Sequence, residues 1–99
     1  MKAKRHYEAW SINEARNFIN YYLSNVTLRD YRLVLEQFAS QVDRTYDAIS
    51  FRQKEVLSIL TDAEHGLPKG RHTKEFIQAV EEKLKEGSIS KARMIDLFH

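Results

Sequence analysis

The chain of 99 residues contains no cysteine, one proline and only three glycines. The absence of cysteine excludes disulfides, thiolate zinc sites, iron–sulfur clusters and cysteine nucleophiles. No apolar run approaches the roughly 20 residues of a membrane-spanning helix, and no signal-peptide core follows the basic start. We therefore expect no membrane partner. The expected location is the cytoplasm of a bacterium or phage-infected host, or the nucleus of a eukaryote.

The excess of positive over negative charge is also small. The 16 Lys and Arg residues are opposed by 14 Asp and Glu residues, which leaves a net charge of +2. This surplus lies within residues 1–60, because the remaining residues are balanced. Proteins that bind nucleic acid mainly through charge are usually more basic, so the composition permits such a partner without requiring one.

Three of the four glycine and proline residues lie in the segment 66–70, which is the clearest break in the chain. Before it the pattern predicts three helices, and after it one or two. The expected organisation is a basic N-terminal arm (1–9), a three-helix domain (10–62), a loop (63–72) and a C-terminal helical extension (73–99). At this length we expect the three-helix core to be the only independently folding unit.

Short capping patterns predict where the helices begin. Ser11 followed by Glu14 fits a capping box, in which each side chain accepts a hydrogen bond from the other residue's backbone amide. Thr and Ser precede the later apolar-periodic segments in the same way. The predicted helices run from Ser11 to Asn25, from Thr27 to Val42, from Thr45 to about Asp62, from Thr73 to Gly87 and from Ser90 onward.

Apolar residues recur at spacings of three and four residues in each segment, which is typical of a helix with one inward face. No stretch alternates as a strand would, so the predicted fold class is all-α. In the second segment the predicted inward stripe is Tyr31, Val34, Leu35, Phe38, Ala39 and Val42.

The connection between the second and third predicted helices is only three or four residues long, around Gln41 to Arg44. A connection this short forces a sharp crossing, which is typical of a helix-turn-helix. The opening Trp10-Ser11-Ile12-Asn13-Glu14 and the later stretch from Phe38 to Ile49, with its Arg44-Thr45 and Ala48-Ile49 pairs, resemble the ends of Myb/SANT-like domains. The resemblance covers about residues 8–60. It implies a three-helix core whose third helix enters the DNA major groove.

A helical wheel of the third helix with Ile49 inward places Asp47, Ser50, Phe51, Lys54 and Glu55 on the outer half. Arg44 in the turn is expected to reach a phosphate, whereas Arg52 is expected near the inner boundary, paired with Glu14 or Glu36. The N-terminal arm either lies along DNA or only solubilises the chain. The candidate nucleic-acid-binding residues are Lys2, Lys4, Arg5, Arg44, Thr45, Tyr46, Ser50, Phe51 and Lys54.

The histidines around the loop and the apolar C-terminal tail are two further features of the sequence. Glu64, His65 and His72 fit no metal-binding spacing, so we expect no metal, and Lys69, Arg71 and His72 form a basic loop instead. The apolar tail from Met94 to Phe98 either docks on the first three helices or makes a homodimer or protein contact through residues 73–99. No catalytic motif is present, so we expect neither an enzyme nor a cofactor.

The sequence therefore favours a DNA-binding protein, a small transcription regulator that reads the major groove of double-stranded DNA with its third helix. The alternative is a protein-interaction adaptor on the same fold, without DNA binding, that acts on a host or transcription protein. Salt dependence separates the two, because cation contacts to phosphate weaken steeply with salt.

Overall fold

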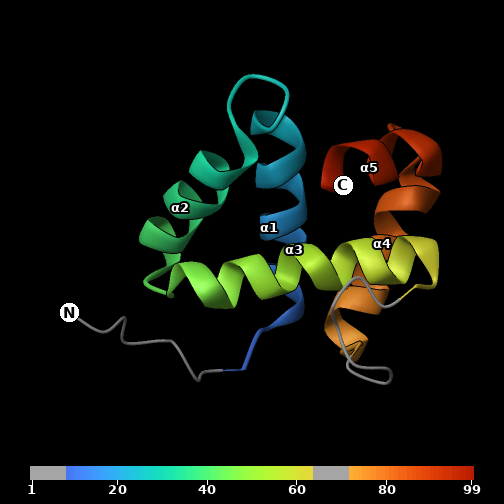
Figure 1. Ribbon diagram of the computed structural model, residues 1–99. Coiled ribbons are helices and arrows are strands. Elements are labelled where there is room, and N and C mark those ends of the chain that lie inside the picture. Colours follow the sequence, from blue (N-terminus) through green and yellow to red (C-terminus); the bar gives the residue numbers. More distant parts are fainter. Residues whose placement is uncertain (1–8, 64–71) are drawn as a thin grey trace.

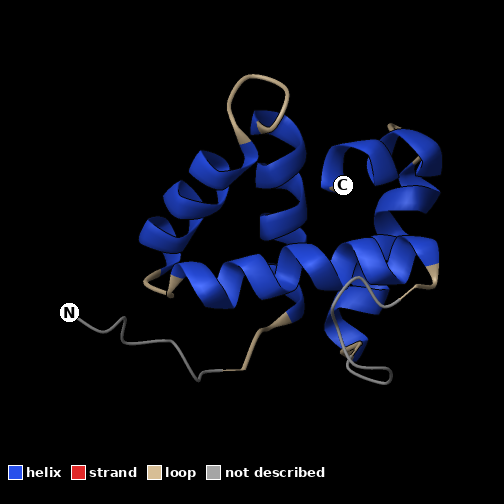
Figure 2. Cartoon of the chain, viewed as in Figure 1, coloured by secondary structure: helices blue, strands red, loops and turns tan. Residues whose placement is uncertain are grey.

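The computed structural model describes residues 9–63 and 72–99, which form helices joined by short turns (Figures 1 and 2). These described residues contain no strand, which confirms the all-α class. None of their helices is long and apolar enough to cross a membrane. In chain order the helices are α1 (Ile12–Asn25), α2 (Tyr31–Val42), α3 (Tyr46–Thr61), α4 (Lys74–Glu86) and α5 (Lys91–Phe98).

Local capping fixes the starts of three helices where the sequence predicts them. The Ser11 Oγ accepts from the Glu14 amide at 3.1 Å, and the Glu14 carboxylate accepts from the Ser11 amide at 3.5 Å, which completes the capping box of α1. The Thr45 hydroxyl accepts from the Ala48 amide at 3.2 Å at the start of α3. Ser90 caps α5 in the same way through the amide of Arg93.

The predicted start of α2 at Thr27 is wrong. The carbonyl of Asn25 accepts from the backbone amides of both Leu28 and Arg29, so the chain makes a turn after α1 and α2 begins only at Tyr31. Tyr31 is consequently the first residue of α2, and its ring is 39% exposed rather than part of the inward stripe. The connection from α2 to α3 is as short as predicted, and Asp43 takes a left-handed conformation (φ 56°) without a glycine.

The helices enclose one hydrophobic core, to which α1, α2 and α3 contribute most of the buried side chains and α4 and α5 add Phe76, Ala79, Val80, Met94 and Phe98. Figure 1 shows α3 crossing the middle of α4, with α2 at the left of the view and α5 at the right. Helix α1 packs mainly on α4, whereas α3 packs on α2, α4 and α5. The Phe18 ring on α1 lies at the centre, with centroid distances of 5.3 Å to Phe38, 6.2 Å to Phe76 and 6.4 Å to Phe98.

The C-terminal helices dock on the rest of the same chain. Met94 and Phe98 are fully buried, and the Phe98 ring stacks on Tyr22 at 4.2 Å between centroids. The Tyr22 hydroxyl donates to the carbonyl of Leu97 at 2.9 Å, and the side-chain amide of Gln53 on α3 donates to the carbonyl of Phe98. Of the two alternatives for the apolar tail, docking in cis is therefore the one observed. A homodimer or partner contact through the outer surface of residues 73–99 stays a prediction.

Candidate nucleic-acid interface

The part of α3 from Asp47 to Lys54 carries a stripe of side chains that are exposed or half-buried. Asp47, Phe51 and Lys54 are exposed and Ser50 is half-buried, whereas Ile49 on the opposite side of the helix is completely buried. We call the residues Asp47, Ser50, Phe51 and Lys54 the α3 stripe. Its most unusual member is Phe51, which is 39% exposed although large apolar side chains are mostly buried in proteins.

Two further predicted binding residues lie at the start of the same helix. Thr45 and Tyr46 are both half-buried, and the Thr45 hydroxyl is engaged in capping α3. Burial raises the pKa of Tyr46, the phenol of Tyr31 raises it further, and the guanidinium of Arg32 opposes the rise. The structure therefore brings Thr45, Tyr46 and the α3 stripe together.

Arg44 is a structural residue, and the prediction that it reaches a phosphate is wrong. It is only 3% exposed, and its Nη2 lies 3.3 Å from both carboxylate oxygens of Glu14 and 3.3 Å from the carbonyl oxygen of Ala9. Its guanidinium carbon also lies 4.5 Å from the ring centroid of Trp10. After the left-handed turn at Asp43 the side chain points inward, where it neutralises a partly buried carboxylate.

Glu55 also lies inside the protein, although the helical wheel places it on the outer half. It is 0% exposed and accepts from Arg52 Nη1 at 2.6 Å, from the Thr73 amide at 2.6 Å and from the Thr73 hydroxyl at 3.0 Å. The partner of Arg52 is thus Glu55, and the predicted pairing with Glu14 or Glu36 is wrong. Thr73 is the N-cap residue of α4 but makes no side-chain capping bond, because its hydroxyl donates to the Glu55 carboxylate instead.

Arg32 is a cation beside the start of α3 that the sequence reasoning missed. It is exposed on the first turn of α2, and its Nε donates to the Tyr31 hydroxyl at 3.3 Å. Its charge opposes the rise that burial causes in the pKa of Tyr46, so it acts electrostatically on the start of α3. The sequence predicts that Arg32 is exposed, because this residue lies outside the apolar stripe of the second helix.

The remaining predictions concern segments that are only partly described. Lys2, Lys4 and Arg5 of the arm lie outside the described residues, as do Glu64, His65, Lys69 and Arg71 of the loop. His72 is described, and its Nε2 lies 2.7 Å from the Ser58 Oγ. Within residues 9–63 and 72–99, no group of three or more His, Asp and Glu side chains is placed to hold a metal ion.

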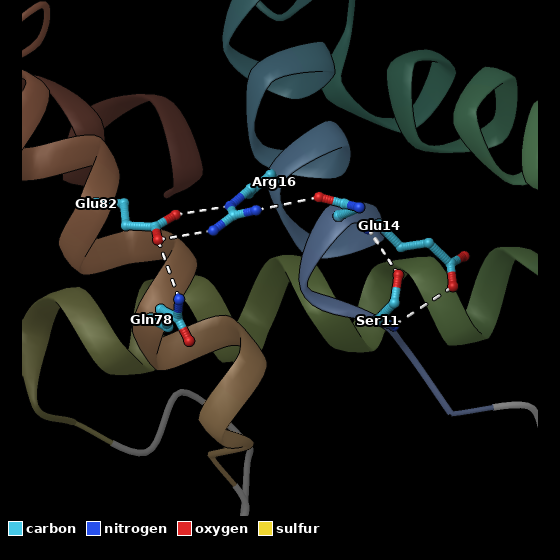
Figure 3. A network of polar contacts seen from close by, with 6 residues as sticks. Ser11, Glu14, Arg16, Gln78 and Glu82 are labelled. Carbon is cyan, nitrogen blue, oxygen red and sulfur yellow. Dashed lines mark hydrogen bonds and ion pairs between the residues drawn. The ribbon is translucent and has the colours of Figure 1, made fainter.

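A second polar cluster lies between α1 and α4. Arg16 donates to both carboxylate oxygens of Glu82, at 2.7 and 2.8 Å, and to the side chain of Asn13 at 3.1 Å (Figure 3). Gln78 adds a hydrogen bond to Glu82, and these bonds lower the pKa of Glu82 to about 2. The adjoining hollow has a volume of about 110 Å³ and its charged residues of both signs are paired. This cluster joins α1 to α4.

Comparisons of the chain with protein-family models, with curated proteins and with solved structures found no match. The α3 stripe is the best candidate for a binding surface, because it combines a cation, a hydroxyl, a carboxylate and an apolar ring on one helix face.

Proposed function

We propose that the protein binds double-stranded DNA and acts as a small transcription regulator, with the α3 stripe in the major groove. The observation that carries the proposal is the exposure of this stripe on a helix whose opposite side is firmly packed. A major groove about 12 Å wide admits one α-helix, and side chains on the early turns of that helix meet the base edges.

The resemblance to Myb/SANT-like domains supports a helix-turn-helix core. The two ends of the resembling pattern, which are about 30 residues apart, contact each other. Arg44 of the later stretch pairs with Glu14 and lies over the ring of Trp10, and both of these belong to the opening stretch. A chance likeness of two short patterns gives no reason for their residues to meet. The contacts thus favour a structural role for the pattern.

The charges around the stripe are compatible with DNA. Lys54 is exposed on the stripe, and the charge of Arg32 opposes the rise that burial causes in the pKa of Tyr46, so a second cation acts on the start of α3. Asp47 opposes phosphate but is able to accept a hydrogen bond from the amino group of cytosine. With so few cations we expect weak binding by one chain, and a second copy or a partner would strengthen it.

The test is a titration of labelled duplex DNA at low and moderate salt. The wild type is expected to bind at low salt and to lose affinity as salt rises. Lys54→Glu is expected to weaken binding at least tenfold and to reduce the salt slope by about one contact. The matched control is Lys91→Glu, which makes the same charge change on the exposed first residue of α5. Equal loss in both variants would contradict a specific role of the α3 stripe.

The second candidate is an adaptor that binds a protein through the same stripe. The observation that favours it is the exposed ring of Phe51, because aromatic side chains are enriched at protein interfaces. The absence of any duplex binding at low salt would favour the adaptor. A salt-independent complex with a host or transcription protein that Phe51→Ala abolishes would establish it.

A further inference from the structure

Phe51 stands out among the residues of the α3 stripe. The polar members of the stripe, Ser50 and Lys54, are ordinary for a solvated helix face. Phe51 is different, because it is 39% exposed and contact between an apolar ring and water is energetically unfavourable. The ring therefore gains most from contact with another apolar group. On DNA the major groove offers one apolar group at base level, the C5 methyl of thymine.

A cation that is anchored inside the protein lies beside the Phe51 ring. The guanidinium carbon of Arg52 lies 5.5 Å from the Phe51 ring centroid, and the same group lies 5.4 Å from the ring of Trp10 and 5.2 Å from that of Phe76. The hydrogen bond from Arg52 to the buried Glu55 fixes this guanidinium, and Glu55 is fixed by Thr73. The apolar ring of Phe51 therefore lies next to a cation whose own position is fixed by ion pairing.

The neighbours of Phe51 on the stripe fit a position at base level. Ser50 precedes it and Lys54 lies one turn further along the helix, so the ring is flanked by a hydroxyl that accepts or donates hydrogen bonds and by a cation suited to guanine or phosphate. A ring placed between such groups projects into the groove when they reach the base edges and the backbone.

We propose that Phe51 is a base-reading residue that contacts the C5 methyl group of a thymine. The inference rests on the proposed function and adds to it the chemistry of the preferred target, a duplex with a thymine at one fixed position. Cytosine at that position lacks the methyl group, and 5-methylcytosine restores it. The protein therefore distinguishes bases there by a single methyl group.

The experiment uses the full chain and the tightest-binding duplex selected from a random pool. Each thymine of that duplex is replaced in turn by deoxyuridine, which removes only the methyl group. For the wild type, one replacement is expected to weaken binding about fourfold, which corresponds to the burial of one methyl-sized group. For Phe51→Ala the same replacement is expected to have no effect. With a C·G pair at this position, 5-methylcytosine is expected to bind the wild type more tightly than cytosine.

Lys54→Ala serves as the control variant. It is expected to weaken binding to all duplexes while keeping the fourfold effect of uracil, because it leaves the ring in place. Unfolding curves of both variants check that the fold is retained. Duplex binding without any uracil effect, or an uracil effect that persists in Phe51→Ala, would overturn this inference and leave DNA binding intact. The absence of duplex binding at low salt would overturn the proposed function, and this inference with it.

Discussion

The two halves of α3 belong to one continuous helix but have opposite surroundings. In the first half Asp47 and Phe51 are exposed on one face, whereas Ile49 and Gln53 on the opposite face are buried, so this half packs against its neighbours along one side. In the second half the four consecutive residues Glu55, Val56, Leu57 and Ser58 are all buried. Four consecutive residues point in all directions around a helix, so the second half is enclosed by its neighbours.

This difference shows how one half of a helix can remain exposed when packing of the other half fixes the position of the whole helix. The second half is fixed by α4 and α5, and because a helix is stiff over 16 residues, the first half is fixed with it. The accessory helices are therefore part of what holds the stripe in place. Breaking the enclosure is expected to cost much stability, whereas changes on the stripe are expected to alter binding and to change stability only slightly.

The largest effect is expected from removal of the Phe98 ring, through which α5 packs on α1. Phe98→Ala deletes a fully buried side chain that stacks on Tyr22, so we expect a loss of about 4 kcal/mol in the free energy of unfolding, measured in urea. Leu28→Ala is the control, because Leu28 is 76% exposed and its truncation is expected to change stability by less than about 0.5 kcal/mol. Equal effects of the two substitutions would contradict docking of α5 in cis.

A somewhat smaller effect is expected from the buried carboxylate. Glu55→Ala leaves Arg52 without its ion-pair partner and two donor groups of Thr73 without their acceptor, at an expected cost of about 3 kcal/mol. The matched control is Glu81→Ala on the exposed face of α4, which is expected to be nearly neutral. A loss below about 1 kcal/mol for Glu55→Ala would show that the enclosure does not depend on this group.

The contrast between the halves also explains what the sequence predicts well. The start of α3 at Thr45 and the exposure of Phe51 and Lys54 follow from local signals, a capping residue and an apolar period. The start of α2 was misplaced at Thr27 because that residue also resembles a cap. The competing turn is closed by the carbonyl of Asn25, which accepts two amides, and no residue type marks that geometry.

The sequence predicts Arg44 and Glu55 at the surface, and both are buried, for a different reason. Charged residues are rarely buried unless they are paired, so a single sequence favours placing them outside. Their partners lie far along the chain: Glu14 is 30 residues before Arg44, and Thr73 is 18 residues after Glu55. Such pairs follow from the way the helices cross, and periodicity within one helix carries no information about that.

A small effect on stability is expected from truncation of Phe51 in the first half of α3. Because Phe51 is partly exposed, Phe51→Ala is expected to lower the free energy of unfolding by about 1 kcal/mol or less. The control is Leu57→Ala on the same helix, where the side chain is 5% exposed and truncation is expected to cost about 2–5 kcal/mol. Similar costs at both positions, again measured in urea, would mean that the stripe is as firmly packed as the second half.

The smallest effect is expected at the exposed counterpart of Glu55, which is Glu82. Its side chain is 41% exposed and pairs with Arg16, so screening by water keeps its contribution to stability small. The pairing lowers the pKa of Glu82 from 4.5 to about 2, so its stabilising contribution is complete above about pH 4.5 and is lost as the pH falls through about 2.

Glu82→Gln is therefore expected to be slightly less stable than the wild type at pH 7 and equally stable near pH 2. The measurement is a series of urea unfolding curves between these values, with Glu81→Gln as the neighbouring control. Charge pairing requires the difference between wild type and Glu82→Gln to shrink as the carboxylate becomes protonated. A difference that stays constant down to pH 2 would mean that Glu82 joins α1 to α4 by packing and neutral hydrogen bonds rather than by its charge.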